Sequence, residues 1–149
     1  MREQAIQDLI TDYHILRTSW VFGSHGENFV FSMKHLVEFR NTLCVVNDQF
    51  GRPTWNRTLA EFMIYLFLTN PPNGVYHFSN DNSCSWYVFA KEILKSDGVI
   101  INPISSSQFT KKAIRPQYSV MDLSKAKDIG FQIPTWQDTL TKMLKENIG

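Results

Sequence analysis

The sequence predicts an α/β or mixed α+β fold, and three observations lead to this prediction. Short apolar runs that suit buried strands alternate with segments whose apolar residues recur at helical spacing. The connections between them are short, and no repeat or low-complexity stretch interrupts them. The 149 residues match the size of one domain, and 43% hydrophobic residues are enough for a substantial core.

The first quarter of the chain predicts a helix, a buried strand and a second helix. Apolar residues within 5–10 share one helical face. YHILRTSWVFG at 13–23 suits a strand that is buried on both sides and runs out into a loop, and burial on both sides is typical of strands in parallel sheets. Because such a strand needs neighbours on both sides, we expect the chain to be the second part of a larger fold. The second helix covers about 29–37, with Asn28 as its N-cap.

The middle of the chain predicts two strands and a strongly apolar helix. LCVVN at 43–47 suits a short strand, and DQFGRPTWN at 48–56 is a turn-rich loop. Apolar residues from Leu59 to Phe67 define the helix, which ends at NPPNG. VYHFS at 75–79 suits a third strand.

The last part predicts three helices and a fourth strand. NDNSCS at 80–85 caps a helix with an aromatic face, and VIINPI at 99–104 suits the strand. A short helix from about Ser124 ends at Gly130. Thr135 caps the final helix, with an acidic residue three positions later.

Charge and composition exclude several classes of function. Lys and Arg number 15 against 14 Asp and Glu, so the net charge of +1 provides no basic surface for nucleic acid. The longest apolar run, FMIYLFL, is far too short to cross a bilayer, and the charged N-terminus does not resemble a signal peptide. We therefore expect neither nucleic acid nor a membrane as a partner.

The cysteines and histidines predict neither a disulfide framework nor a metal site. Cys44 and Cys84 are too few for a framework and lack a zinc pattern, which favours the reducing cytoplasm. The four histidines are scattered, and none stands at metal-ligand spacing with a carboxylate or a cysteine. We expect a cytoplasmic protein without a metal.

The stretch SWYVFAK contains Tyr87-x-x-x-Lys91, the spacing of the catalytic pair in short-chain dehydrogenases. On a helix these positions share a face, and the ammonium would lower the pKa of the phenol. An ordinary core helix explains the same letters, because Trp86, Phe89 and Ala90 build an apolar face that the pair would flank. No glycine-rich phosphate loop precedes the pair, so we favour the core helix.

Three further stretches concentrate groups that suit ligand binding. RTSWVFG places Trp20 and small hydroxyls at a strand end, where α/β sheets bind ligands, although a core tryptophan is an equal alternative. VVNDQFGRPTWNRTLA at 45–60 clusters polar groups around a turn that could equally be structural. IRPQYS holds Arg115 against a proline, which suits phosphate, whereas a surface arginine is the plainer alternative.

Taken together, these stretches resemble one family. ILRTSWVFGSHGENFV, VVNDQFGRPTWNRTLA, GVYHFSNDNSCSWYVFAKEI and IRPQYSVMDLSKAKDIGF are similar in order and spacing to the C-terminal half of the dTDP-4-dehydrorhamnose reductases, which are extended short-chain dehydrogenases. The similarity covers almost the whole chain, and NDQFG-x-PT at 47–54 is its most specific part. The resemblance implies the substrate-binding half of that fold, with few short strands and about five helices.

The resemblance also implies a division at residue 23. Residues 1–23 would be a helix and a strand of the cofactor-binding Rossmann domain, and residues 24–149 would form the sugar-nucleotide-binding domain. In the family, the catalytic Tyr-x-x-x-Lys lies upstream of the RTSW strand, so Tyr87 and Lys91 match a structural helix instead. We therefore expect no catalytic residue in this chain.

The family's ligand contacts fall, by resemblance, on residues of the three polar stretches and the helix start after the first. The implied substrate-binding residues are Ser19, Trp20, Asn28, Phe29, Gln49, Pro53, Thr54 and Arg115, and the implied cofactor-binding residues are Thr18 and Ser19. Trp20 would lie near the sugar and the nicotinamide, and Arg115 would bind the diphosphate. Some family members bind a metal through a carboxylate after the turn, but Arg57 stands there and repels a cation, so we expect no metal.

The implied reaction is hydride transfer from NADPH or NADH to the C4 keto group of dTDP-4-dehydro-L-rhamnose, which gives dTDP-L-rhamnose. Because the half that positions the cofactor is not in this chain, we expect the chain alone to be inactive. A non-catalytic binding or regulatory module with the same fold is the alternative, and a domain that pairs with a separately encoded cofactor half is a third hypothesis. Apolar surface on the first helix and strand should drive self-association unless the cofactor domain covers it.

Overall fold

The strands are short and mostly parallel in the computed structural model, which describes residues 2–108 and 115–146. In these ranges the strands form four two-stranded sheets. The parallel pairs are β1 (His14–Arg17) with β6 (Gly74–His77), β2 (Val21–Phe22) with β5 (Thr54–Trp55) and β3 (Thr42–Val46) with β8 (Ile100–Ile104), and the antiparallel pair is β4 (Phe50–Gly51) with β7 (Cys84–Ser85). Because parallel pairing requires a crossover, at least one helix lies in sequence between the partners of each parallel pair, which confirms the predicted class.

The helices follow the predicted periodicity closely. They are α1 (Arg2–Leu9), α2 (Phe29–Val37), α3 (Asn56–Thr69), α4 (Trp86–Ile93), α5 (Ser124–Asp128) and α6 (Trp136–Glu146), with a 3₁₀ turn at Ser106–Gln108. Two predicted caps are confirmed. The Asn28 side-chain oxygen accepts the Val30 N–H at 3.0 Å, and Thr135 Oγ1 accepts the Asp138 N–H at 3.2 Å.

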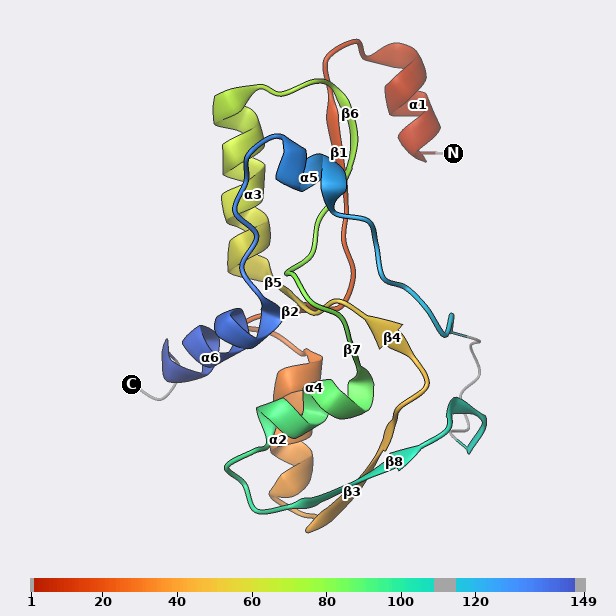
Figure 1. The fold of residues 1–149 in the computed structure, drawn as a ribbon, viewed down its shortest axis with the longest axis vertical. Coiled ribbons are helices and arrows are strands. Elements are labelled where there is room, and N and C mark those ends of the chain that lie inside the picture. The colour runs from red at the N-terminus through yellow and green to blue at the C-terminus, as the bar shows by residue number, and fades with distance from the viewer. Residues whose placement is uncertain (1, 109–114, 147–149) are drawn as a thin grey trace.

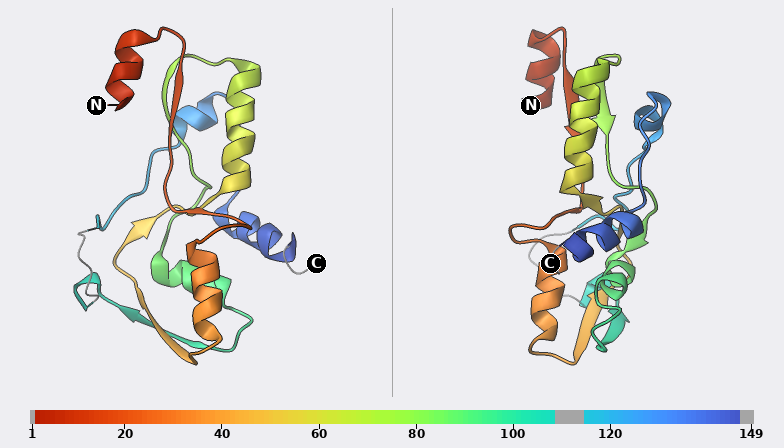
Figure 2. Two further views of the ribbon diagram at one scale, coloured as in Figure 1. Left: turned by 180° about the vertical axis from the view of Figure 1, so that it is seen from behind. Right: turned by 90° about the vertical axis from the view of Figure 1, so that its left-hand side faces the viewer.

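Two hydrophobic clusters divide the elongated molecule into an upper and a lower part (Figure 1). The upper cluster joins α3, β6 and α5 through Phe62, Leu66, Tyr76, Phe78 and Ala126. The larger lower cluster lies among α2, α4, β3 and α6. The views from behind and from the side place α1 at the upper end, away from the lower cluster (Figure 2).

The stretch at 13–23, expected to be a strand that runs out into a loop, contains two short strands. β1 ends at Arg17 and β2 begins at Val21, because Trp20 has a left-handed φ of 51° that interrupts the extended chain. β1 is buried only at Ile15, and among the described residues it pairs with β6 alone. The expectation of burial on both sides is therefore wrong for this structure, since one edge of β1 has no partner there. The division at residue 23 stays a prediction.

Large apolar side chains remain exposed on α1 and α3. Phe67 is 84% exposed, Leu68 is 74% exposed, and Met63 and Ile64 lie one turn earlier on the same face of α3. On α1, Leu9 is 82% exposed. The opposite face of α3 packs into the upper cluster, so this helix carries two apolar faces and only one of them is covered. Within the described ranges, no helix has the length and apolar character needed to cross a membrane.

The two cysteines differ in reactivity, and this difference is directly testable. Cys84 is 5% exposed, and burial raises the pKa of its thiol to about 12. Cys44 is exposed on β3. We expect one thiol, that of Cys44, to react with a disulfide reagent at pH 8 in the folded chain, and a second thiol only after denaturation. Two fast thiols in the folded wild type, or one fast thiol in the folded Cys44→Ser variant, would contradict the buried position of Cys84.

Candidate functional site

A pocket of about 320 Å³ lies where four separate segments meet. One wall comes from the turn between β1 and β2, and another from the residue before β4. The first residue of α4 and the segment before α5 complete it. The lining residues are Ser19, Trp20, Gln49, Trp86, Arg115, Pro116 and Ser119. Indole faces, one amide and one cation thus converge on a single cavity, which is typical of ligand sites.

Two indoles form the apolar wall of this pocket. The rings of Trp20 and Trp86 stack with their centroids 3.5 Å apart and an interplanar angle of 10°. Phe29 packs against Trp86 from α2, with ring centroids 4.5 Å apart. A flat pair of this kind offers a broad apolar face to a sugar ring or a base.

Trp20 is held in place by an unusual backbone and by a glycine. Its φ of 51° lies in the left-handed region, which non-glycine residues seldom adopt and which marks functional sites. A Cβ at Gly51 would lie 2.3 Å from Cε2 of the Trp20 indole, so only glycine fits beneath the ring. The β2–β5 pairing adds a fixed point, because the Thr54 N–H donates to the Trp20 carbonyl at 3.0 Å. The indole is therefore pre-positioned without a ligand.

The polar groups of the pocket leave hydrogen-bonding capacity for a ligand. Ser19 Oγ is buried and has no hydrogen-bond partner among the described residues, although buried hydroxyls are normally paired. Arg115 is exposed and lines the pocket. A guanidinium at the mouth of an apolar pocket suits a phosphate or a carboxylate, which it can bind through two parallel hydrogen bonds.

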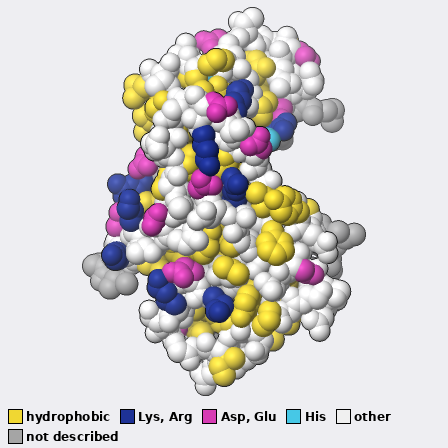
Figure 3. All heavy atoms as spheres, viewed as in Figure 1, with side chains coloured by type: hydrophobic (Ala, Val, Ile, Leu, Met, Phe, Trp, Pro, Cys, Tyr) yellow, Lys and Arg dark blue, Asp and Glu magenta, His cyan; other side chains and the backbone are white. Residues whose placement is uncertain are grey.

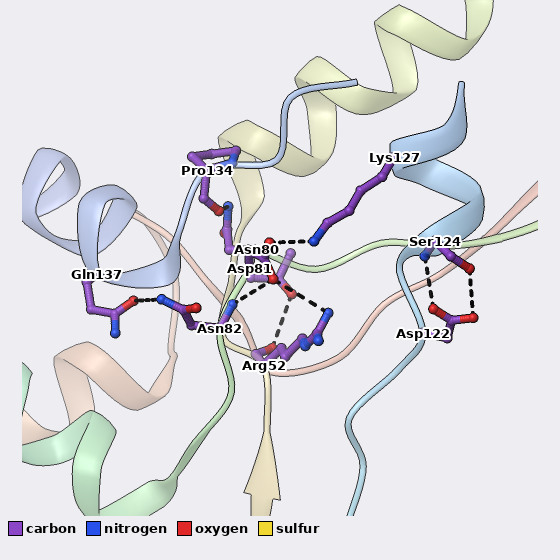
Figure 4. A network of polar contacts seen from close by, with 10 residues as sticks. Arg52, Asn80, Asp81, Asn82, Asp122, Ser124, Lys127, Pro134 and Gln137 are labelled. Carbon is purple, nitrogen blue, oxygen red and sulfur yellow. Dashed lines mark hydrogen bonds and ion pairs between the residues drawn. The ribbon is translucent and has the colours of Figure 1, made fainter. Parts of the chain in front are cut away.

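A charged network holds the turn behind Gly51 (Figure 4). Lys127 Nζ on α5 donates to Asp81 Oδ2 at 2.6 Å, and Arg52 Nη1 lies 3.9 Å from Asp81 Oδ1. The backbone N–H of Asp81 donates to the Pro134 carbonyl at 2.9 Å. Oppositely charged side chains also lie side by side near the centre of this face of the molecule (Figure 3). The network joins the turn, α5 and the segment before α6, so it fixes the back of the pocket wall.

The buried amide of Asn80 ties the same segments together from inside. Its Oδ1 accepts the Trp55 N–H at 2.7 Å, and its Nδ2 donates to the Pro134 carbonyl at 3.2 Å. Asn80 is 0% exposed. The Trp55 N–H would otherwise be buried without a partner, so the amide stabilises the junction between the two clusters.

Removing the charge of Asp81 should destabilise the chain in a pH-dependent way. The hydrogen bond from Lys127 holds the pKa of Asp81 below its ordinary value of 3.8. The stability from this pair is therefore present above about pH 4 and is lost as the pH falls through the lowered folded value. We expect Asp81→Asn to lower the free energy of unfolding by about 1 kcal/mol at pH 7, because the pair is partly exposed.

The measurement is chemical denaturation of wild type and Asp81→Asn at several pH values. The difference between the two proteins should shrink as the pH falls from 5 towards 3. Asp128→Asn is the matched control, since Asp128 lies exposed on α5 beside Lys127 and forms no ion pair among the described residues. A difference that stays constant over this pH range would show that the charge of Asp81 is not its source.

The structure brings four of the expected site residues together and places the others behind them. Ser19, Trp20, Gln49 and Arg115 line the pocket. The remaining expected residues do not line it; they are Thr18, Asn28, Phe29, Pro53 and Thr54. Their roles as ligand contacts stay predictions.

The residues behind the pocket have structural partners of their own. The Asn28 amide caps α2 and donates to the Gly23 carbonyl at 3.0 Å. Thr54 is fully buried, and its hydroxyl donates to the Ser19 carbonyl at 2.7 Å. These contacts support the pocket wall and leave the polar groups of Asn28 and Thr54 engaged within the protein. Phe29 acts similarly through its packing against Trp86.

Three pocket residues were not expected from the sequence, namely Trp86, Pro116 and Ser119. Trp86 was placed on the core face of its helix, and helical periodicity gives no sign that this indole stacks on Trp20 from a distant segment. The neighbouring Tyr87 and Lys91 do not line the pocket. Lys91 Nζ lies 5.5 Å from the centre of the Tyr87 ring, and Tyr87 packs against the lower cluster. The pair therefore belongs to an ordinary helix face, as we favoured.

No group of three or more His, Cys, Asp or Glu side chains in the described part of the chain could hold a metal ion. Arg57 follows the turn, as the second residue of α3. Its guanidinium contacts Glu61 at 3.3 Å and Glu146 at 2.9 Å, so these two carboxylates are paired with a cation.

The chain is similar to one protein family and to several known proteins. A sequence model of the family described as the RmlD substrate binding domain matches residues 1–148. The spore coat polysaccharide biosynthesis protein SpsK of Bacillus subtilis is 40% identical over 146 residues, which are 97% of this chain and 51% of SpsK. The dTDP-4-dehydrorhamnose reductase of Streptomyces griseus is 34% identical, over 94% of this chain and 49% of that enzyme.

Solved structures show the same similarity in three dimensions. The dTDP-4-dehydrorhamnose reductase of Bacillus anthracis, in complex with NADP, matches 97% of this chain and 52% of its own, with a TM-score of 0.88 and 37% identity. The Clostridium acetobutylicum reductase matches 99% of this chain and 53% of its own, with a TM-score of 0.92 and 31% identity. The chain spans about half the length of these relatives. From the family match over almost its whole length, it follows that this chain belongs to the RmlD substrate-binding domain family.

Proposed function

We propose that this chain supplies the sugar-nucleotide side of a dTDP-4-dehydrorhamnose reductase. The observation that carries the proposal is the pocket itself, in which the Trp20–Trp86 platform lies beside Gln49 and Arg115. A nucleotide sugar needs these three kinds of group. The deoxysugar or the base packs on an indole face, the diphosphate pairs with a guanidinium, and an amide hydrogen-bonds to hydroxyls or to the base.

In this proposal, the complete enzyme transfers a hydride from NADPH or NADH to the C4 keto group of dTDP-4-dehydro-L-rhamnose. The cofactor supplies the hydride when bound. Ser19 fits a cofactor or a sugar, since its buried hydroxyl lacks a partner among the described residues and lies next to Trp20. The sequence contains no glycine-rich loop that could hold a dinucleotide diphosphate. We therefore expect the 149-residue chain alone to bind but not to reduce.

A second part of the proposal concerns the uncovered apolar faces. The cofactor-binding half of a reductase would cover the exposed face of α3 around Phe67 and add a strand to the free edge of β1. The half-length match to whole reductases supports this assignment.

Without that half, we expect the chain to self-associate through the same face. Sedimentation velocity at increasing concentration measures this, and Phe67→Glu should restore a monomer. A wild-type chain that is monomeric at all concentrations would argue against an uncovered docking face.

The same proposal places the chain in the cytoplasm. Both cysteines are free, and the exposed Cys44 thiol fits a reducing compartment.

Calorimetric titration with dTDP, then with dTDP-L-rhamnose, tests the binding function directly, with NADPH as the comparison ligand. We expect both nucleotides to bind and NADPH to bind far more weakly. Arg115→Ala should weaken dTDP binding by about tenfold or more, because charge-assisted hydrogen bonds to a diphosphate contribute about 1.5–3 kcal/mol. Arg40→Ala is the matched control, since Arg40 is exposed after α2 and does not line the pocket. If none of the three ligands binds, the proposal is overturned.

A non-catalytic binding or regulatory module is the second candidate, because no candidate general acid or base is among the described residues that line the pocket. Mixing the chain with the cofactor-binding half of the Bacillus anthracis reductase separates the two. Restored turnover of dTDP-4-dehydro-L-rhamnose identifies a reductase half, whereas nucleotide-sugar binding without turnover identifies the module.

A further inference from the structure

The hydroxyl of Ser85 links the start of α4 to a distant segment of the chain. Its oxygen accepts the Val88 N–H at 3.2 Å, which caps the helix. Its proton is donated to Asn47 Oδ1 at 2.6 Å. Ser85 is 0% exposed, so its proton needs a partner of this kind within the protein. The next residue, Trp86, is the first of α4 and one of the two stacked indoles of the pocket.

Helix capping alone does not require the bond to Asn47. The cap of α6 shows the local alternative, because the Thr135 hydroxyl accepts the Asp138 N–H and donates its proton to the carboxylate of the same residue. The first turn of α4 has no acidic residue, and the Ser85 proton crosses instead to a residue 38 positions earlier. Because a hydroxyl can donate and accept at once, Ser85 both caps its helix and ties it to a second segment.

The segment that receives this bond also holds the other indole. Residues 47–51 end at Gly51, the glycine that lies against the Trp20 ring. The antiparallel pair of β4 and β7 joins the end of this segment to the backbone of Ser85. The start of α4 is thus attached twice, by the backbone pairing and by the Asn47 side chain. The two indoles therefore take their relative position from one short segment.

We propose that Asn47 is a positioning residue, which sets the Trp86 indole against Trp20 through the hydroxyl of Ser85. The inference rests on the proposed function, in which the indole pair holds a ring of the nucleotide sugar. Asn47 and Ser85 do not line the pocket, so neither is a ligand group. The stack depends on the offset and tilt of its two rings, and a small rotation of the first turn of α4 would change both. Asn47 acts on the ligand only by way of Trp86.

Circular dichroism of the free chain tests this positioning without a ligand. The stacked pair should give a tryptophan signal, which is identified as the part that Trp86→Phe removes. We expect Asn47→Ala to lose most of that signal and to keep its helix content, because Ser85 can still cap α4. Asn47→Asp should retain the signal, since a carboxylate oxygen accepts the same hydroxyl proton. Asn73→Ala is the matched control, because this exposed amide bonds the Thr11 carbonyl and does not line the pocket.

Calorimetric titration with dTDP-L-rhamnose measures the consequence for the ligand. Asn47→Ala should weaken binding by about fivefold, and Asn47→Asp and Asn73→Ala each by less than about twofold. On the Trp86→Phe background, Asn47→Ala should have no further effect, because both changes act through one indole.

The two measurements separate the positioning role from the proposed function. An unchanged indole signal in Asn47→Ala, an equal loss of signal in Asn47→Asp, or a further loss of affinity on the Trp86→Phe background would overturn the positioning role. Failure of the wild type to bind dTDP-L-rhamnose would overturn the proposed function alone, since the dichroism signal reports on the indole pair whatever the chain binds.

Discussion

Replacing Asn80 with alanine should lower the free energy of unfolding by about 2 kcal/mol. The change leaves the Trp55 N–H buried without its partner, since Asn80 Oδ1 accepts that N–H and Asn80 is 0% exposed, whereas the Pro134 carbonyl keeps its hydrogen bond from the Asp81 N–H. Each orphaned buried group costs about 1–3 kcal/mol, which exceeds the net value of an ordinary hydrogen bond. The loss should appear in urea denaturation as a lower midpoint with an unchanged slope.

Asn73 provides the matched control for this experiment. Its Nδ2 donates to the Thr11 carbonyl at 2.7 Å, so it too bonds a backbone carbonyl, but at an exposed position. Water can replace that bond, and Asn73→Ala should therefore cost less than about 1 kcal/mol. A loss in Asn80→Ala as small as that in Asn73→Ala would mean that water reaches the junction between the two clusters.

Replacing Gly51 with alanine should displace the Trp20 indole and weaken dTDP binding by about tenfold or more. The added Cβ would lie 2.3 Å from the ring, a distance that no real contact permits, so the indole must leave its stack on Trp86. Half of the apolar wall would then be misplaced. A tenfold loss corresponds to about 1.4 kcal/mol, well within what one displaced aromatic platform contributes.

Near-ultraviolet circular dichroism should report the loss of the stacked indole pair, and calorimetry the loss of affinity. Gly26→Ala separates pocket geometry from backbone strain. Gly26 has a φ of 75° with nothing near its missing Cβ, so alanine there costs stability without touching the pocket. We expect Gly26→Ala to keep both the dichroism signal and dTDP affinity. If Gly51→Ala bound dTDP as the wild type does, the Trp20 platform would not be part of the nucleotide site.

Much of the fold follows from local patterns in the sequence. Apolar residues at helical spacing place α2, α3, α4 and α6, and the caps at Asn28 and Thr135 mark where two of them begin. These features depend on residues within one or two turns, which is why they can be predicted without tertiary information. The strand before Trp20 shows the limit. Its residues suit a strand that leads into a loop. The left-handed φ of Trp20 and the second short strand after it cannot be predicted from the local sequence pattern.

The candidate site follows from the sequence only in part. Resemblance to a family was enough to single out Ser19, Trp20, Gln49 and Arg115, which the structure brings to one pocket. Trp86 was missed, because its helical spacing matches a core position equally well. Which of the expected residues face the pocket and which brace it, such as Thr54 with its engaged hydroxyl, depends on contacts between distant segments.

The sequence by itself determined the class of fold, the helix positions, the family and the absence of a glycine-rich cofactor loop. Only the tertiary structure decided the stacked platform, the need for glycine at position 51 and the uncovered face of α3. The physical reason is the range of the interactions. Helix periodicity and caps act over a few neighbouring residues, whereas stacking, close backbone approach and burial arise between segments that meet only when the chain folds.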